Sequence, residues 1–590
     1  MSTKHFVTNI DKLVVDALEA LTLTNPDVVY YKADKVIAKK SHDPQTHVAV
    51  ISGGGAGHEP AHAAFVGEGM LTAAASGWIF ASPSVAQIER AILAVAGPKG
   101  VLLIIKNYTG DIFHFSLAAE KARSRGIPAE VVVVGDDVAV GRTKSGKVGR
   151  RGLAGTVLVH KVAGAVAARP ESTLGEVVAA AKEVTENLVS VGVSLNHVHI
   201  PGRKIEAENI MAEDEAELGL GIHNEKGCIR LKPIPSLPDL VKTMLDQMIN
   251  KTDADRAYVD FATADNVVLM VNNLGGLSPL ELGAITNEVV GQLTSRGLRP
   301  TRLFSGTYMT SLDGPGFSIT LLRASDTVLT YLDAPTKAVG FTPGSVVTAD
   351  SPSRVIVESI AQKSGHAHTN GHTNGHTNGH TNGHSKPTIL DPAKFISCVK
   401  LACEKVIAAE PQITQYDTVV GDGDCGYTIR RAAEAVLSFV TFSSENISPT
   451  VSTIQDLAET VENNMDGTSG AIFSIFLHAL ATSVSHFDTL LDENDWGRAA
   501  ADALNTLYAA TPARPGDRTL VDALAPFVDT LASGKGIKKA ALAGRKGAEG
   551  TKGMNASLGR AVYVDAKGYD RVPDPGAVGI AELVEGLAGL

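Results

Sequence analysis

Three carboxylates and three glycines stand within ten residues, in the stretch DTVVGDGDCG at 417–426. Asp417, Asp422 and Asp424 are too close together to remain ionised comfortably without a counter-charge, so a divalent cation is the expected partner. Mg²⁺ prefers oxygen ligands and completes its octahedron with water and substrate phosphate. The stretch therefore indicates phosphoryl transfer, with a solvated acidic turn as the alternative.

The same stretch matches the spacing G-x-G-x-x-G through Gly421, Gly423 and Gly426. Two acidic side chains beside these glycines would repel a pyrophosphate unless a metal stood between them, which argues against a dinucleotide site. The chain contains no G-x-x-x-x-G-K-[ST] motif and no protein-kinase signature. A phosphotransferase with this sequence therefore belongs to neither of those classes.

A second candidate site lies in SGGGAGHEPAHAAFVG, residues 52–67. Its glycines permit positive φ and let backbone N–H groups approach an oxyanion. His58 and His62 are spaced by four, which would suit a metal at the start of a helix, but no third ligand is evident. A tight turn with one useful histidine is the preferred interpretation.

Two further stretches carry polar groups whose roles are open. IIKNYTGDIFHF, residues 104–115, places Lys106 and Asp111 just beyond a predicted strand, as a surface pair or as part of a site. LGLGIHNEKG, residues 218–227, holds His223 between small residues and a polar turn, where a structural role is the common one.

The composition of the chain argues against several classes of function. The 590 residues are enough for several domains, and a net charge of -11 leaves no broad basic surface for nucleic acid. Four cysteines form neither a disulfide framework nor a C-x-x-C pair, which indicates a reducing compartment. No apolar run is long enough for a membrane span and the N-terminus has no signal-peptide core, so we expect a cytoplasmic protein with no membrane partner.

The predicted helices and strands that must position these groups divide the chain into regions of different character. Helix-like and strand-like runs alternate up to about residue 200, which predicts an α/β layer fold. Its predicted buried strands occupy residues 48–51, 101–105 and 130–134. Function in such folds gathers beyond the carboxyl ends of strands, where the glycine loop and Lys106 stand. We expect one α/β subdomain at 1–200 and a second, more β-rich one at 201–350.

Residues 364–387, SGHAHTNGHTNGHTNGHTNGHSKP, contain four H-T-N-G repeats and no apolar residue larger than alanine. Such a segment cannot form a core, so we expect a flexible linker. Six of the 18 histidines of the chain stand here, but nothing fixes their geometry for a metal.

Residues 388–590 follow the helical period almost throughout. Asp391 is a predicted N-cap with Pro392 at the first helical position, and the apolar faces that follow predict an all-α helical barrel or bundle. DGTSGA, residues 466–471, precedes an apolar helix. Its backbone N–H groups could hold a nucleotide phosphate, or the motif could simply cap the helix.

Three N-terminal motifs, GGGAGHEPAH, KNYTGD and GLGIHNEKG, resemble those of the substrate-binding K domain of the dihydroxyacetone kinase family. The resemblance covers nearly all of residues 1–345. Ala56 replaces the usual serine, and Asn224 and Lys226 replace a glycine and a proline, which bears on the shape of that loop rather than on its role. The C-terminal motifs D-x-x-x-x-GDGD, GTSG, GDRT and DPGA resemble the nucleotide-binding L domain of the same family.

This resemblance implies a kinase that transfers the γ-phosphoryl group of ATP to dihydroxyacetone, in glycerol and dihydroxyacetone catabolism and detoxification, and that also accepts glyceraldehyde. His223 is implied to bond covalently to the substrate carbonyl, and Asp111 to act as general base. His58 is implied to share in catalysis as a polar contact. The implied substrate-binding residues are Gly55, Ala56, Gly57, His58, Lys106, Asp111 and His223.

The implied cofactor is Mg²⁺, as two ions held by Asp417, Asp422 and Asp424, in a domain spanning 388–590. The implied ATP contacts are Asp422, Gly423, Asp424, Cys425, Gly467, Thr468, Ser469, Gly470, Arg518, Thr519, Asp574, Pro575 and Gly576.

Alternatives remain open at this point. Some members of the family also form cyclic FMN from FAD, and relatives with separate K and L subunits take phosphate from a phosphotransferase system. Fusion in one chain, without a third phosphohistidine-bearing domain, favours free ATP. A catalytically silent triose-binding regulator is the alternative from a different class. We also expect a homodimer, in which the linker lets an L domain dock on its own K domain or on the partner's.

Overall fold

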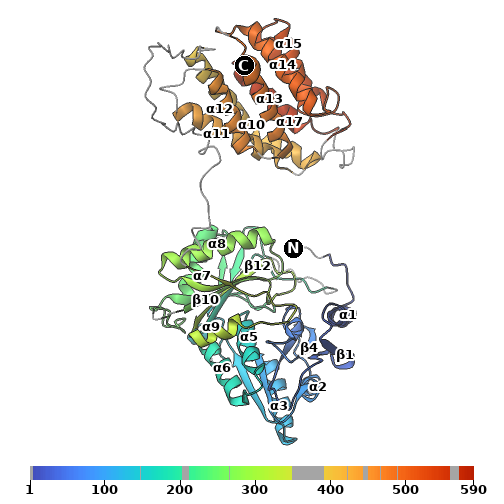
Figure 1. The fold of residues 1–590 in the computed structure, drawn as a ribbon, viewed down its shortest axis with the longest axis vertical. Coiled ribbons are helices and arrows are strands. Elements are labelled where there is room, and N and C mark those ends of the chain that lie inside the picture. The colour runs from blue at the N-terminus through green and yellow to red at the C-terminus, as the bar shows by residue number, and fades with distance from the viewer. Residues whose placement is uncertain are drawn as a thin grey trace, which may run out of the picture. The chain divides into compact units, whose positions relative to one another are not determined.

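The computed structural model describes residues 4–145, 148–201, 211–262, 264, 266–348, 391–421, 423–442, 450–465, 467–487, 490–558 and 570–590. The chain divides into two compact units, Met1–Ala367 and His368–Leu590 (Figure 1). The predicted linker at 364–387 lies outside the described residues.

The first sheet of the N-terminal unit has the strand order β1-β2-β4-β3-β5-β6. Neighbouring strands from β4 to β6 are parallel, whereas β1 and β2 join the edge antiparallel. The strands are β1 Val28–Tyr31, β2 Val36–Lys39, β3 Ala49–Ala56, β4 Ala73–Ile79, β5 Val101–Lys106 and β6 Ala129–Val134. The three strands predicted in this region are confirmed as β3, β5 and β6. β3 and β5 are buried throughout, whereas β6, at the edge of the sheet, leaves Val133 exposed.

Helices cover both faces of this sheet. Ile88, Ile92 and Phe115 pack α2 and α3 against one face, and α1, α5 and α6 pack against the other. The helices are α1 Ile10–Thr24, α2 Val85–Val95, α3 Thr109–Ser124, α4 Arg142–Ser145, α5 Thr156–Ala167 and α6 Leu174–Glu186, with short 3₁₀ turns at Lys32–Asp34 and Ala63–Phe65. Every residue of α5 is buried.

A second sheet has the strand order β13-β11-β10-β12-β7-β8-β9. It consists of β7 Leu188–Ser194, β8 Ala216–Leu218, β9 Ile229–Leu231, β10 Asn266–Asn273, β11 Pro300–Gly306, β12 Gly316–Ala324 and β13 Ser345–Val346. Helices α7 Leu237–Ile249 and α8 Pro279–Ser295 cover one face (Figure 1). Side chains of the other face share one core with α5, α9 Asp326–Asp333 and the first sheet, so both sheets stabilise each other.

The C-terminal unit is all helical in its described residues. Each helix packs against the next, and the last packs back against the first, which closes a ring. The helices are α10 Pro392–Val420, α11 Cys425–Phe442, α12 Val451–Asn464, α13 Gly467–Val484, α14 Glu493–Ala510, α15 Val521–Ala532, α16 Ile537–Gly550 and α17 Pro575–Leu587. The predicted start of α10 is confirmed, since Asp391 accepts a hydrogen bond from the Lys394 N–H and Pro392 opens the helix.

The ring closes tightly between its two end helices. A Cβ placed on Gly586 of α17 would lie 2.4 Å from the Cα of Ala402 in α10, a distance that real side chains do not reach. Glycine therefore lets the end of α17 contact the backbone of α10.

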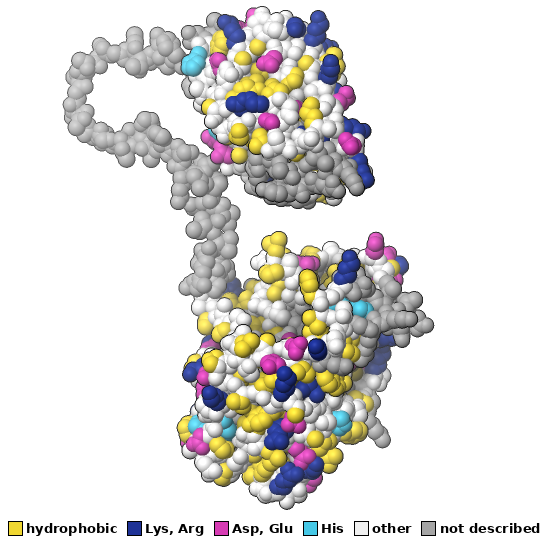
Figure 2. All heavy atoms as spheres, turned by 90° about the vertical axis from the view of Figure 1, so that its right-hand side faces the viewer, with side chains coloured by type: hydrophobic (Ala, Val, Ile, Leu, Met, Phe, Trp, Pro, Cys, Tyr) yellow, Lys and Arg dark blue, Asp and Glu magenta, His cyan; other side chains and the backbone are white. Residues whose placement is uncertain are grey.

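Charged groups of both signs are mixed over the visible face of each unit (Figure 2). Among the helices of the described residues, none is both long and apolar enough to cross a membrane.

Candidate active site

Polar groups gather at the carboxyl edge of the first sheet. Because β3 and β5 are parallel neighbours, the glycine loop and Lys106 emerge at the same edge, and Asp111 follows in the first turn of α3. A Cβ placed on Gly54 would lie 3.0 Å from Lys106 Nζ, and 3.6 Å from both Asp111 Oδ2 and His62 Nε2. Three polar side chains therefore surround a space that a side chain on Gly54 would fill.

Lys106 is fully buried, and a chain of hydrogen bonds fixes its ammonium group. Ser52 donates its hydroxyl proton to the Ile104 carbonyl at 2.7 Å, so Ser52 Oγ accepts from Nδ1–H of His62 at 3.2 Å. Nε2 of His62 then accepts from Lys106 Nζ at 2.8 Å. Burial, followed by the charge of Lys106, lowers the pKa of His62 well below its usual value. His62 is thus a neutral acceptor in a turn, as the non-metal interpretation predicts.

His58 and His223 meet edge to edge although they come from different sheets. Their Nε2 atoms are 2.9 Å apart. His58 contacts the Thr310 carbonyl oxygen through Nδ1 at 2.8 Å. His223, in the loop after β8, contacts Glu225 Oε1 through Nδ1 at 2.9 Å, and its backbone N–H donates to Glu225 Oε2 at 2.9 Å.

The partners of these two rings determine where their protons lie. A carbonyl oxygen and a carboxylate can only accept, so both Nδ1 atoms donate. The short contact between the two Nε2 atoms then contains one proton, and the pair carries one positive charge. Burial, then the charge of His223, lowers the pKa of His58 well below its usual value. Burial alone would raise the pKa of Glu225, but its hydrogen bonds to His223 and the charge of that ring lower it to about 2.

Asp111 is 3% exposed and accepts a hydrogen bond from the Ser82 hydroxyl through Oδ1 at 2.5 Å. Its other oxygen faces the space beside Gly54. Ala56 and the backbone of Gly55 are buried in β3. Gly57 has φ +101, and a Cβ there would lie 2.7 Å from the Phe80 ring, so glycine is required at this point.

Three residues of this pocket were not predicted as site residues. Glu225 stands two positions after His223 in the same motif, which is the signal that could have identified it. Ser82 and Thr310 lie far from the motifs in sequence, and no local pattern marks them.

The loop after α10 encloses the first predicted metal ligand of the C-terminal unit. Asp417 is 7% exposed, and its Oδ2 accepts a hydrogen bond from the Cys425 N–H at 3.0 Å. Asp424 is exposed at the start of α11, and Gly423 has φ +80. Asp422 lies outside the described residues, and no three acidic, histidine or cysteine side chains of the described residues are grouped as a metal site. Carboxylate oxygens are nevertheless the donors that Mg²⁺ prefers, so the residues fit the ion.

Further loops converge beside this one. Gly467–Gly470 form the first turn of α13, and Ser469 in this turn lies near the Cys425 thiol. A cavity of about 630 Å³ opens next to this turn. Its lining includes Met465, Gly470, Ala471, Ser474 and His478.

Arg518 and Asp574 tie the remaining loops together. Arg518 is 1% exposed, and its guanidinium donates to the backbone carbonyls of Thr551 and, at 2.9 Å, Val572. Asp574, followed by Pro575 and Gly576, caps α17 by accepting from the Ala577 N–H at 2.8 Å. Burial raises the pKa of Asp574 to about 7, with nearby Asp522 and Asp417 adding to the rise. The Thr519 N–H donates to Asp522 Oδ2 at 2.8 Å.

Comparison with known proteins matches two domains in this chain. Residues 19–340 match the Dak1 domain and residues 419–589 match the DAK2 domain. The dihydroxyacetone kinase of Pichia angusta is 43% identical over 100% of this chain and 98% of its own length. The triokinase/FMN cyclase of Homo sapiens is 37% identical over 100% of this chain and 99% of its own length.

A solved structure also matches this chain over its full length. The dihydroxyacetone kinase of C. freundii in complex with AMP-PNP and Mg²⁺ is 30% identical, and the match covers all of both chains with a TM-score of 0.59. The chain therefore belongs to the dihydroxyacetone kinase family, in the form that carries both domains in one chain.

Proposed function

We propose that this chain, an ATP-dependent dihydroxyacetone kinase, holds its ketone through His223 and activates the substrate hydroxyl through Asp111. The observation that carries the assignment is the meeting of His223, His58 and Glu225 at the edge where Lys106 and Asp111 emerge. A nucleophilic nitrogen, a proton acceptor beside it and a separate carboxylate are the groups that carbonyl addition and hydroxyl activation require.

Proton positions support a reversible adduct. His223 passes its Nε2 proton to Nε2 of His58, and the freed lone pair attacks the carbonyl carbon. As the C–N bond forms, the carbonyl oxygen takes the proton from His58 and becomes a hydroxyl. The positive charge remains on the alkylated His223 ring, opposite the ionised Glu225, so no charge is created in the buried pocket.

Transfer then needs a base on a terminal hydroxyl. Asp111 Oδ2 takes the hydroxyl proton as the oxygen attacks the γ-phosphorus, while the Ser82 hydroxyl orients the carboxylate through Oδ1. Lys106, held by His62, supplies positive charge beside the developing alkoxide.

The C-terminal unit supports the nucleotide role. Asp417, Asp422 and Asp424 would hold Mg²⁺, as two ions, and Gly467–Gly470 would bind phosphate through the N-terminal amides of α13. The metal supplies charge neutralisation on the phosphates. Arg518 supports its loops rather than offering a free guanidinium, because its side chain is buried against backbone carbonyls.

Finer features of the function are also proposals. Activity on glyceraldehyde is supported by the likeness to a triokinase/FMN cyclase, and formation of cyclic FMN from FAD is assayed separately with Mn²⁺. The four cysteines are free thiols, which supports a cytoplasmic location. A homodimer is expected, and sedimentation of the full chain tests it.

The assignment is tested with dihydroxyacetone labelled with ¹³C at the carbonyl carbon. We expect the bound signal to move to the tetrahedral region in the native chain and in Asp111→Asn, but not in His223→Ala. Asp111→Asn should lose ADP release by orders of magnitude while keeping the adduct, since the base alone is removed. His223→Ala should lose the preference for the ketone over glycerol. A trigonal bound ketone in the native chain would disprove the bonding role.

A further inference from the structure

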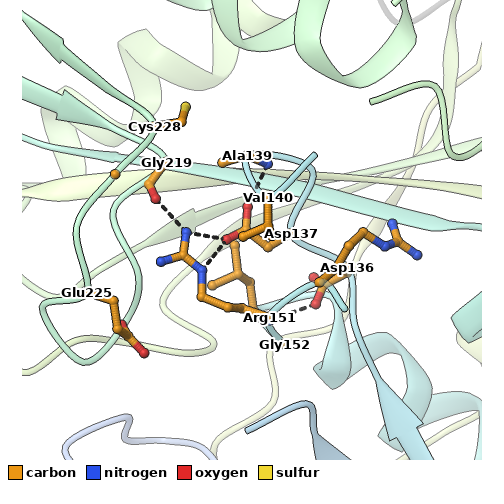
Figure 3. Close-up of polar contacts among 12 residues, drawn as sticks. Asp136, Asp137, Ala139, Val140, Arg151, Gly152, Gly219, Glu225 and Cys228 are labelled. Atoms are coloured by element: carbon orange, nitrogen blue, oxygen red, sulfur yellow. Dashed lines mark hydrogen bonds and ion pairs between the residues drawn. The ribbon is translucent and has the colours of Figure 1, made fainter. Parts of the chain in front are cut away.

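A buried ion pair lies behind the loop that carries His223. The Asp137 side chain is 0% exposed and follows the end of β6. Its Oδ2 accepts from Nε of Arg151 at 2.8 Å and from Nη2 at 2.6 Å, while its Oδ1 accepts from the Ala139 N–H at 2.9 Å. Figure 3 shows the Arg151 guanidinium lying between Asp137 and the loop. Asp137 therefore fixes the direction in which Arg151 points.

Arg151 also holds the backbone of that loop. Its Nη2 donates to the carbonyl of Gly219 at 2.6 Å (Figure 3). Gly219 is the first residue after β8, and the loop from Gly219 to Gly227 contains His223. One guanidinium thus connects the end of the first sheet to the start of the His223 loop in the second.

Gly221 brings the same guanidinium close to Glu225. A Cβ on Gly221 would lie 2.7 Å from Arg151 Nη1 and 2.0 Å from Glu225 Oε2, so both charged groups flank one glycine. The Gly221 N–H donates to the Glu225 carbonyl at 2.9 Å, which keeps the turn closed. The carboxylate that orients His223 and the Arg151 guanidinium therefore lie beside the same turn.

The charges of Asp137, Arg151 and Glu225 depend on one another. Burial raises the pKa of Asp137 to about 6, against the lowering effect of Arg151. Burial lowers the pKa of Arg151, but Asp137 and Glu225 both raise it, and the net shift is upward. Removing the guanidinium would leave the carboxylates of Asp137 and Glu225 without the positive charge that both interact with. A buried charge without a partner is costly inside a protein.

We propose that Arg151 is a positioning residue for the reaction: held by Asp137, it fixes the His223 loop and, through Glu225, keeps Nε2 of His223 aimed at the ketone carbon. The inference rests on the proposed role of His223 as the residue that bonds to the substrate. Arginine is required because its planar fork donates in several directions at once, whereas lysine offers a single point charge.

The test compares Arg151→Gln and Arg151→Lys with the matched control Arg150→Gln. Arg150 is adjacent, but its guanidinium lies 4.1 Å from the Tyr258 ring and donates to the Leu188 carbonyl, away from the loop. We expect Arg151→Gln to lower the tetrahedral ¹³C signal of bound dihydroxyacetone and raise its KM about 100-fold. The KM for ATP should not change, and Arg151→Lys should be intermediate. Arg150→Gln should behave as the native chain does.

A double-variant cycle separates the proposed route from a general structural effect. If Arg151 acts through Glu225, then Arg151→Gln combined with Glu225→Gln should lose little more adduct than the worse single variant. Independent losses that multiply would overturn the proposal. If Arg151→Gln does not fold, Gly221→Ala gives a second test, because its Cβ would displace both Glu225 Oε2 and Arg151 Nη1 from their places beside this turn; a native adduct there would overturn the proposal.

Different results would contradict the bonding role of His223 and the positioning role of Arg151. Absence of the tetrahedral signal in the native chain would contradict the bonding role of His223. A native signal that persists unchanged in folded Arg151→Gln, at the native KM, would leave that role intact and overturn the positioning role.

Discussion

Asp417 and Asp424 belong to one predicted metal site but have different surroundings. Asp417 is buried and holds the loop through the Cys425 N–H, so replacing it disturbs structure as well as charge. Asp424 is exposed, and its side chain has no recorded hydrogen bond among the described residues. Asp424 is therefore the better residue for testing the ion.

We expect Asp424→Asn to fold normally and to lose turnover by orders of magnitude, because the amide replaces a charged oxygen that serves the metal and not the core. ADP release measured across a Mg²⁺ titration checks this, with the exposed Asp529→Asn of α15 as control. Near-normal turnover at ordinary Mg²⁺ would rule out the metal role of Asp424.

At the residue scale, the resemblance of the motifs to a known family implied the groups that are proposed to carry the chemistry, but not those that support them. The patterns around His223 and Asp111 left their roles open, and only the family motifs in which they stand pointed to them. Arg151 and Thr310 act through contacts with residues distant in sequence, and those contacts exist only once two sheets share a core. A periodicity or a spacing cannot contain that information.

At the scale of elements, α5 is unusual because all of its residues are buried between the two sheets. His160 in this helix is 0% exposed, and neither ring nitrogen has a hydrogen-bond partner among the described residues. Burial, followed by the charge of Lys106, lowers the pKa of His160 to about 3. The folded chain therefore keeps this ring neutral, whereas the unfolded chain protonates it below its ordinary pKa of about 6.5.

His160→Leu should accordingly make the N-terminal unit less sensitive to acid. Between pH 6.5 and 3 the unfolded state binds more protons than the folded state at this position, so the native chain loses up to about 1.4 kcal/mol per pH unit there. The melting temperatures of the variant and the native chain should be similar at pH 7. As the pH falls to 5, the melting temperature of the variant should rise relative to that of the native chain. The same substitution at the partly exposed His47 should give no such divergence; equal slopes for both would contradict the account.

The loops of the C-terminal unit depend on Arg518 in a comparable way. Arg518→Met removes the donors for two backbone carbonyls and the cation that opposes the charge of Asp574. We expect a loss of about 3 kcal/mol in the free energy of unfolding of this unit. Trp496 fluorescence during urea unfolding reports it in a Trp78→Phe background, since the chain has two tryptophans. The exposed Arg514→Met is the control, and equal midpoints for both variants would refute the supporting role.

Elements differed in how well the sequence predicted them. Short runs rich in β-branched residues predicted β3, β5 and β6, and the cap at Asp391 predicted the start of α10. The short strands β8, β9 and β13 were not predicted, because two or three residues give no alternation to recognise. The GTSG motif forms the first turn of α13 itself rather than a loop before it, since its small residues adopt helical geometry.

At the scale of the whole molecule, the composition of residues 364–387 predicts a tether between the two compact units. Replacing the H-T-N-G repeats by Gly/Ser of equal length should preserve the rate of ADP release. Doubling the length should lower it by about threefold at most, because effective concentration falls gradually with linker length. A large loss on the equal-length exchange would show that the histidines have a role of their own.

The closed ring of helices has a consequence for how the C-terminal unit could be encoded. Because the end of α17 contacts the first half of α10, the first and last helices are neighbours like any other pair in the ring. A short peptide could join Leu590 to the start of α10, and the chain could begin instead at the exposed turn between α15 and α16. Such a circular permutant would keep every helix contact, so the present order of helices is one of several that the same packing allows.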